Sequence, residues 1–216
     1  MRLHLRRAML KYLPHCYSLS YAGELEKAVG LNCKTILDVG CGSNSPMKAF
    51  SGKFYLVGTD AHKPSLEESR KKGIHNEYYC MTFSELDKLE CYAFDCVVAL
   101  DVIEHLKKGE GLQFLDNIER IAKKKIIVYT PNGFVPQEEF SNNPWQVHRS
   151  GWTVKEMRLR GYKVVGIGGL KSLRGERAAI RFNPKPLWET VSLLSQYIVA
   201  DYSELAYAIL CIKIKE

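Results

Sequence analysis

Several features are missing from this 216-residue sequence, and each absence excludes a class of protein. The longest uninterrupted apolar run, residues 205–212, has 8 residues, whereas a helix that crosses a bilayer needs about 20. No internal repeat is visible. The seven cysteines contain no C-x-x-C pair and no zinc-site spacing. We therefore expect no membrane span, no repeat architecture and no metal site.

The N-terminal segment also lacks the features of a secretion signal. It is basic, but its only uninterrupted apolar stretch is Ala8–Leu10, which is too short for a secretory signal. Several cysteines lie inside apolar runs, as reduced and buried cysteines do in intracellular proteins. These features predict a cytoplasmic protein. Hydrophobic residues make up 46% and charged residues 25%, which is typical of one globular domain of this length.

Acidic residues are scarce at the two ends of the chain. Residues 1–20 carry four basic and no acidic side chains, and residues 151–216 carry 11 basic and 6 acidic ones. A nucleic-acid surface usually shows a denser basic stripe with interleaved aromatic residues, so nucleic acid is not expected as a partner. A solvated basic surface is the simplest interpretation, and an anionic small-molecule partner is the alternative.

Short β-branched runs alternate with helical patterns over most of the chain, which predicts βαβ units and a parallel, doubly wound sheet. The last predicted strand has no crossover after it, so an antiparallel position is open to it. The predicted strands are residues 35–39, 55–59, 76–80, 94–100, 125–130, 163–167 and 206–214; the predicted helices are residues 65–72, 84–89, 111–123, 153–160 and 186–200.

Glycines follow the first predicted strand, which ends at Val39. Gly40 and Gly42 permit a tight turn that brings backbone close to a ligand, and a helix N-terminus is expected near Pro46. Asp60 follows the next strand, where a carboxylate can accept hydrogen bonds from both hydroxyls of a ribose. A dinucleotide fingerprint requires a third glycine, but position 45 is serine. The pattern favours a different adenosine-bearing cofactor.

The segment Ile36–Pro46 resembles motif I of class I S-adenosylmethionine (SAM)-dependent methyltransferases. Further matches in chain order are residues 57–60, 94–106 and 130–133, and Gly161-Tyr162. The resemblance implies a Rossmann-like, doubly wound sheet of seven mostly parallel strands, with an antiparallel last strand and helices on both faces. It also implies a single domain, residues 1–216, with a helical N-terminal lid (1–30), a cofactor-binding core (31–170) and an insertion before the last strand (170–205).

The resemblance assigns cofactor contacts residue by residue. Asp38, Gly40, Cys41 and Gly42 would border the methionine part of SAM. The remaining contacts would be Asp60 and Ala61 at the ribose, Met81 and Thr82 at the adenine, and Leu100 and Asp101 along the end of the fourth strand. From the residues alone, Asp38 can instead be a turn residue, and Asp60 a helix cap.

Two histidines are candidates for a catalytic base, because a near-neutral pKa suits proton abstraction. His105 follows the fourth strand, and His148 lies in the long segment 131–152, which has no clear periodicity. Each has a structural alternative: His105 as the solvated start of a helix, and His148 as a partner of loop backbone. The same region supplies the expected acceptor contacts Asn132, Trp145 and Arg149.

The sequence thus predicts a SAM-dependent methyltransferase whose acceptor is a small or lipid-linked molecule. An anionic acceptor is compatible with this prediction. We expect the basic N-terminal helix to act as a lid, with at most peripheral membrane contact. The alternatives are an RNA or protein methyltransferase and a non-catalytic SAM-binding regulator. Residues 100–103 lack the Asn/Asp-Pro-Pro-Tyr/Phe motif of enzymes that methylate exocyclic amines, which disfavours the RNA alternative. The residues indicate no oligomeric state.

Overall fold

Seven strands form one mixed sheet in the order β3-β2-β1-β4-β5-β7-β6. The computed structural model describes residues 18–30, 32–139, 143–175 and 178–215. Strands β1 to β5 pair in parallel, and β7 lies antiparallel between β5 and β6. The predicted fold, including the antiparallel last strand, is confirmed. The strands are β1 (Thr35–Val39), β2 (Tyr55–Asp60), β3 (Glu77–Cys80), β4 (Phe94–Leu100), β5 (Ala122–Pro131), β6 (Lys163–Leu170) and β7 (Ala206–Ile214).

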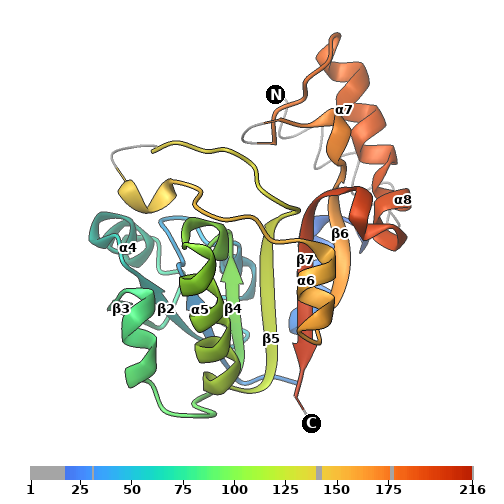
Figure 1. Ribbon diagram of the computed structural model, residues 1–216. Coiled ribbons are helices and arrows are strands. Elements are labelled where there is room, and N and C mark those ends of the chain that lie inside the picture. Colours follow the sequence, from blue (N-terminus) through green and yellow to red (C-terminus); the bar gives the residue numbers. More distant parts are fainter. Residues whose placement is uncertain (1–17, 31, 140–142, 176–177, 216) are drawn as a thin grey trace.

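Helices cover both faces of the sheet, and α5 and α6 lie on the face turned to the viewer in Figure 1. The α-helices are α3 (Tyr21–Val29), α4 (Lys63–Lys71), α5 (Lys108–Ile121), α6 (Val154–Leu159), α7 (Lys185–Leu194) and α8 (Gln196–Asp201). Short 3-10 helices include η1 (Pro46–Phe50), η2 (Phe83–Lys88), η3 (Ile103–His105) and η4 (Pro144–Gln146).

Alternation along β4 creates two apolar cores, because successive strand residues point to opposite faces. Val97 and Ala99 pack in one core with Phe114 of α5. Cys96 and Val98 pack in the other with Leu25 of α3. Both faces of this central strand are therefore buried, as its nearly continuous apolar run predicts.

Three predicted helices differ in the structure. The single helix expected over residues 186–200 is two helices, α7 and α8. They separate at Ser195, whose hydroxyl accepts from the Leu170 N–H (3.0 Å) and donates to the Ser192 carbonyl (2.8 Å). The helix expected over residues 84–89 is the 3-10 helix η2. The segment after the glycine turn forms only η1, where the Ser45 hydroxyl caps the Met47 N–H. The glycine turn therefore leads into a short 3-10 helix and not into an α-helix with its dipole.

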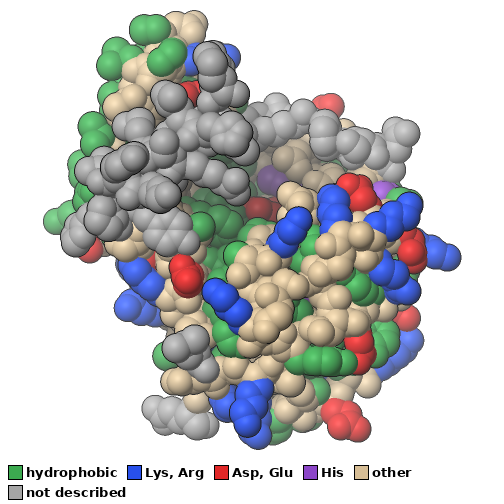
Figure 2. Space-filling model, turned by 180° about the vertical axis from the view of Figure 1, so that it is seen from behind, with side chains coloured by type: hydrophobic (Ala, Val, Ile, Leu, Met, Phe, Trp, Pro, Cys, Tyr) green, Lys and Arg blue, Asp and Glu red, His purple; other side chains and the backbone are tan. Residues whose placement is uncertain are grey.

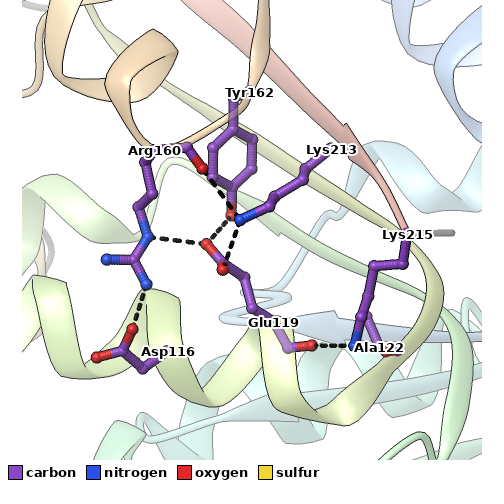
Figure 3. Close-up of polar contacts among 7 residues, drawn as sticks. All are labelled: Asp116, Glu119, Ala122, Arg160, Tyr162, Lys213 and Lys215. Atoms are coloured by element: carbon purple, nitrogen blue, oxygen red, sulfur yellow. Dashed lines mark hydrogen bonds and ion pairs between the residues drawn. The ribbon is translucent and has the colours of Figure 1, made fainter.

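A polar network around Glu119 joins α5 to the antiparallel strands (Figure 3). The Glu119 carboxylate accepts from Arg160 Nε (2.8 Å), the Tyr162 hydroxyl (2.9 Å) and Lys213 Nζ (2.8 Å). Lys215 Nζ donates to the backbone carbonyls of Glu119 and Ala122, each at 2.9 Å. Glu119 is near the end of α5, where the chain enters β5, so the network lies at the amino ends of the parallel strands.

The segment between β5 and α6 crosses above the carboxyl ends of the parallel strands (Figure 1). It is tied down at one end, because the backbone N–H groups of Arg149 (2.7 Å) and Ser150 (3.1 Å) donate to the Glu104 carbonyl. This segment therefore covers the edge where open α/β sheets bind ligands. Among the residues placed by the structure, no helix is long and apolar enough to cross a membrane.

Candidate active site

The glycine turn after β1 brings bare backbone to the carboxyl edge of the sheet. Gly40 and Gly42 have φ angles of +69° and +56°, a left-handed region that favours glycine. A Cβ built on Gly40 would lie 2.5 Å from Cγ2 of Val102, closer than any real Cβ contact. The N–H of Cys41, between the glycines, donates to the Thr59 carbonyl (2.9 Å). This hydrogen bond ties the turn to the end of β2.

Asp38 lies beneath this turn. Its side chain is almost fully buried, and Oδ2 accepts from the Ser45 hydroxyl (2.5 Å) and pairs with Nε2 of His75 (2.8 Å). Asp38 does not line either of the two cavities described below. Its contacts shape the turn, in line with the turn role that the residues alone allowed. Ser45 and His75 were not expected here from the sequence, since neither belongs to a recognisable spacing.

Asp60 connects the glycine turn to the end of β2. Its Oδ2 accepts from the Gly42 N–H (2.8 Å), and its Oδ1 accepts from the His62 N–H (2.7 Å). Burial raises the pKa of the Asp60 carboxyl, although both N–H bonds oppose that shift. An ionised carboxylate has about four acceptor positions, so the two N–H bonds leave room for further donors. Asp60 also lines a cavity, so its carboxylate is accessible to a ligand.

The first cavity extends from Asp60 toward η2. Beyond Asp60, it contains five of the positions predicted to contact the cofactor: Gly40, Ala61, Met81, Thr82 and Asp101. Its apolar wall includes residues that were not predicted from the sequence, because they look like ordinary core residues there. These are Phe83, Leu86, Leu106 and Phe114.

The second cavity, about 420 Å³, continues the first along the ends of β1 and β4. A volume of this size is within the usual range of small-molecule sites. The two cavities share wall residues and are therefore contiguous: Gly40, Asp101, His105 and Gln146 line both. The predicted positions Cys41, Gly42, Leu100 and His148 also line the second cavity.

Two acidic side chains lie close together at this cavity. Glu104 is only 2% exposed, and its Oε2 accepts from the Thr130 hydroxyl (2.9 Å). Burial and the neighbouring Asp101 raise the pKa of Glu104 well above its usual range. The Asp101 side chain is open to the cavity, but surrounding protein raises its pKa to about 6. Of the two carboxyls, Glu104 therefore has the greater tendency to hold a proton.

The two candidate bases meet at the same place. The rings of His105 and His148 lie 4.9 Å apart, edge to face. Nδ1 of His148 contacts the Val135 carbonyl (2.6 Å), and Nδ1 of His105 lies 3.3 Å from the Val147 carbonyl. Burial and the neighbouring His148 lower the pKa of His105 to about 4, and burial lowers the pKa of His148. Both imidazoles are therefore neutral at neutral pH. Figure 2 shows histidine and acidic side chains at a hollow with apolar walls.

The three expected acceptor contacts have different surroundings. Trp145 lines the first cavity. Asn132 is buried, and its Nδ2 donates to the backbone carbonyls of Ser203 and Ala206, so its contacts hold the start of β7. Arg149 is exposed and lines neither of the two cavities. Sequence position alone did not show that Trp145 lines a cavity whereas Asn132 holds the start of a strand.

The predicted N-terminal lid is only partly described. Residues 1–17 lie outside the described residues. The helix α3 lies within the expected lid range, but Leu25, Ala28 and Val29 pack into the core on one face of the sheet. Within the described part, this segment is a core helix.

Comparison with known proteins agrees with the geometry. The family described as "Methyltransferase domain" matches residues 37–129. A ubiquinone biosynthesis O-methyltransferase of Neisseria meningitidis serogroup C (strain 053442) is 26% identical over 132 residues, which is 48% of this chain and 56% of that protein. The serogroup A protein of the same name (strain Z2491) is also 26% identical, over 129 residues, 46% of this chain and 54% of that protein. The chain spans about half the length of these curated relatives.

Solved structures share the fold. Magnesium protoporphyrin IX methyltransferase from Synechocystis PCC 6803, with bound SAM, superposes with a TM-score of 0.54 at 15% identity, covering 94% of this chain and 81% of that one. A SAM-dependent methyltransferase from Archaeoglobus fulgidus gives a TM-score of 0.56 at 15% identity, covering 98% and 94%. The match to the methyltransferase domain covers residues 37–129, less than half of the chain, and together with the sheet order found here it supports a class I SAM-dependent methyltransferase.

Proposed function

We propose that this chain transfers a methyl group from SAM to a hydroxyl of a small, lipid-linked acceptor. One observation carries the proposal: two contiguous cavities lie at the carboxyl edge of the sheet. Asp60 lines the first, the glycine turn lines the second together with Glu104 and His148, and His105 lines both. This arrangement offers a place for a nucleoside and a place for a nucleophile. The names of the relatives from Neisseria meningitidis support an oxygen nucleophile.

The residues present fit SAM. The turn at Gly40 and Gly42 would receive the amino-acid tail, since both glycines line the second cavity with bare backbone. Asp60 would take the ribose with its remaining acceptor positions, and Met81 and Thr82 would flank the adenine. When bound, SAM supplies a methyl carbon on a positively charged sulfur; transfer forms the O–CH₃ bond and breaks the S–CH₃ bond, whose electron pair stays on sulfur.

A third cavity supports a lipid-linked acceptor. It measures about 320 Å³ and shares Tyr129, Ala178 and Tyr207 with the second cavity. Its walls also include Ile167 and Leu193, which provide apolar surface for a hydrocarbon tail. An anionic head group has weaker support. The Arg174 guanidinium at this cavity donates to the carbonyls of Gly168 (2.6 Å) and Ala178 (2.8 Å), so much of its donor capacity serves the loop.

The protein's own contribution is alignment, exclusion of water and removal of the acceptor proton. His105 and His148 are the candidate groups for proton removal, because both face the second cavity and are neutral. With a pKa of about 4, the imidazole of His105 holds a proton weakly at neutral pH. Of the two, His148 is the stronger candidate for a direct base.

The proposal is tested in two steps. Calorimetry with SAM and S-adenosylhomocysteine should show binding of both at one site per chain. Transfer from radiolabelled SAM should then be measured with dihydroxybenzenes that carry either no side chain or a prenyl chain, with mass spectrometry to identify a methyl ether. We expect a methyl ether and a preference for the prenylated acceptor. Binding of both nucleosides with no product from any acceptor would instead support a regulator, and label in RNA or protein would support an RNA or protein methyltransferase.

A further inference from the structure

We propose that Glu104, His105 and His148 form a binding site for one divalent first-row transition-metal cation, which activates the acceptor hydroxyl. Each residue offers one ligand atom, and the three atoms lie within 4.8 Å of one another. The part of the proposal that concerns the acceptor rests on the proposed function. Cation binding itself does not, because it needs neither SAM nor acceptor.

The spacing is suitable after a small inward movement. Metal–ligand bonds of about 2.0–2.2 Å to nitrogen and oxygen hold neighbouring donor atoms roughly 3 Å apart. Donor atoms that start within 4.8 Å of one another would close by up to about 2 Å. Side-chain rotation can supply a movement of this size without a change of fold.

The histidines are already oriented as metal ligands usually are. In metal sites, a ligating histidine generally donates its second ring N–H to a backbone carbonyl or carboxylate, which fixes the ring. Here Nδ1 of His148 lies 2.6 Å from the Val135 carbonyl, and Nδ1 of His105 lies 3.3 Å from the Val147 carbonyl. For His148 this contact places the proton on Nδ1 and leaves Nε2 as the ligand atom. The ring of His105 is held by the backbone of Val147 and Asp101 and offers one ring nitrogen to the cluster.

The Glu104 carboxylate gives independent support for a cation site. Within the described residues, Oε1 of Glu104 is buried and has no hydrogen-bond donor. Its carboxyl also neighbours that of Asp101. An unpaired acceptor that is buried beside a second acid costs free energy unless a proton or a cation neutralises it. A divalent cation would satisfy Oε1.

The donor set also indicates the class of cation. Two imidazole nitrogens favour first-row transition metals, whereas Mg²⁺ and Ca²⁺ prefer oxygen ligands. Three protein ligands leave coordination positions open, as in catalytic sites, and the second cavity provides space beside them. An acceptor hydroxyl could occupy one of these positions.

The chemistry would then need no strong base. A cation that holds the acceptor oxygen lowers the pKa of its hydroxyl. The O–H bond breaks, the proton leaves to solvent, and the oxygen keeps the electron pair with which it takes the methyl group. In this route His105 and His148 act as ligands, and the ligand role of His148 replaces the direct-base role given above.

The test uses Mn²⁺ as the probe, because this ion has little affinity for the free thiols of the chain. Electron paramagnetic resonance of free Mn²⁺ during titration of the full chain should show one bound equivalent. His148→Ala and Glu104→Gln should each weaken binding by about tenfold or more, at least the loss seen when a metal's supporting partners are removed. His62→Ala should leave binding unchanged, since His62 contacts Ser65 at the start of α4, outside the cluster.

Separate measurements distinguish failure of this inference from failure of the proposed function. Calorimetry with SAM in EDTA tests cofactor binding alone, and EDTA with Mn²⁺ restoration tests methyl transfer. Loss of transfer in EDTA and its return with Mn²⁺ would support the cation site. No bound Mn²⁺, or binding that is equal in wild type, His148→Ala and Glu104→Gln, would overturn it, even if SAM binds normally. A circular-dichroism melt confirms that each variant is folded.

Discussion

Replacement of Asp60 by alanine tests the cofactor site at its most specific contact. Each Asp60 oxygen already accepts one backbone N–H, from Gly42 or His62, so the carboxylate is held in place with acceptor positions to spare. Hydrogen bonds to a charged acceptor contribute about 1.5–3 kcal/mol. If the ribose hydroxyls make such bonds, Asp60→Ala should weaken SAM binding by about 10- to 150-fold, at 1.4 kcal/mol for each factor of ten.

The loss of affinity alone would not identify the ribose, because the variant also leaves the Gly42 and His62 N–H groups without their acceptor. The assay therefore compares S-adenosylhomocysteine with its 2′-deoxy analogue by calorimetry, in wild type and in Asp60→Ala. We expect the analogue to bind more weakly than the parent compound in wild type and nearly equally in the variant. An equal ratio of the two affinities in both proteins would refute the assignment of Asp60 to the ribose.

Three further predictions concern the turn, the fold and pH. Gly40→Ala should lower the free energy of unfolding by more than Gly42→Ala, because its Cβ meets Val102 at 2.5 Å, whereas the Cβ of Gly42→Ala has no heavy atom within 4 Å and adds only backbone strain of about 1–2 kcal/mol. Both variants should weaken SAM binding in calorimetry, since both glycines line the second cavity. Equal free energies of unfolding for the two variants in urea would contradict this. Glu119→Ala should lower the free energy of unfolding by about 2–4 kcal/mol, because it leaves Arg160, Tyr162 and Lys213 without their shared acceptor. Asp116→Ala removes only an exposed ion pair and should lower it by less than about 1 kcal/mol. Urea unfolding measures both values, and calorimetry should show an unchanged SAM affinity in both variants. Acidification from pH 6.5 toward 4 should lower the free energy of unfolding through His105, whose folded pKa is lowered to about 4, whereas Asp101, with its folded pKa raised to about 6, should raise it over the same range. In Asp101→Asn, the free energy of unfolding measured in urea should therefore fall more steeply with acidification than in wild type. Parallel plots of this free energy against pH for the two proteins would contradict this balance.

The sheet was predictable because each strand is marked by its own residues. The apolar run of β4 required burial on both faces, and the alternation of strands with helical patterns required parallel crossovers. Helix boundaries were less predictable. The break between α7 and α8 depends on the bond from Leu170 to Ser195, a contact between segments that local spacing does not reveal.

The site was predictable where chemistry is local in sequence and less so where it is not. Gly40, Gly42 and Asp60 are recognisable from a strand, a turn and the next strand. The partnership of Asp38 with His75 joins two segments that share no motif. The same holds for Glu104, His105 and His148, since the segment after β5 brings His148 to the other two. A search for metal-ligand spacing in the sequence therefore finds nothing, although the folded chain places three ligand atoms together.

The position of the bound nucleoside decides whether the proposed chemistry is possible, and a crystal structure of the chain with S-adenosylhomocysteine measures this position directly. We expect the ribose hydroxyls within hydrogen-bond distance of the Asp60 carboxylate, the amino-acid tail against the turn at Gly40, and the sulfur directed toward His105 and His148. Nucleoside density away from the ends of β1 and β2, or crystals grown at saturating ligand with side chains filling this cleft, would contradict it.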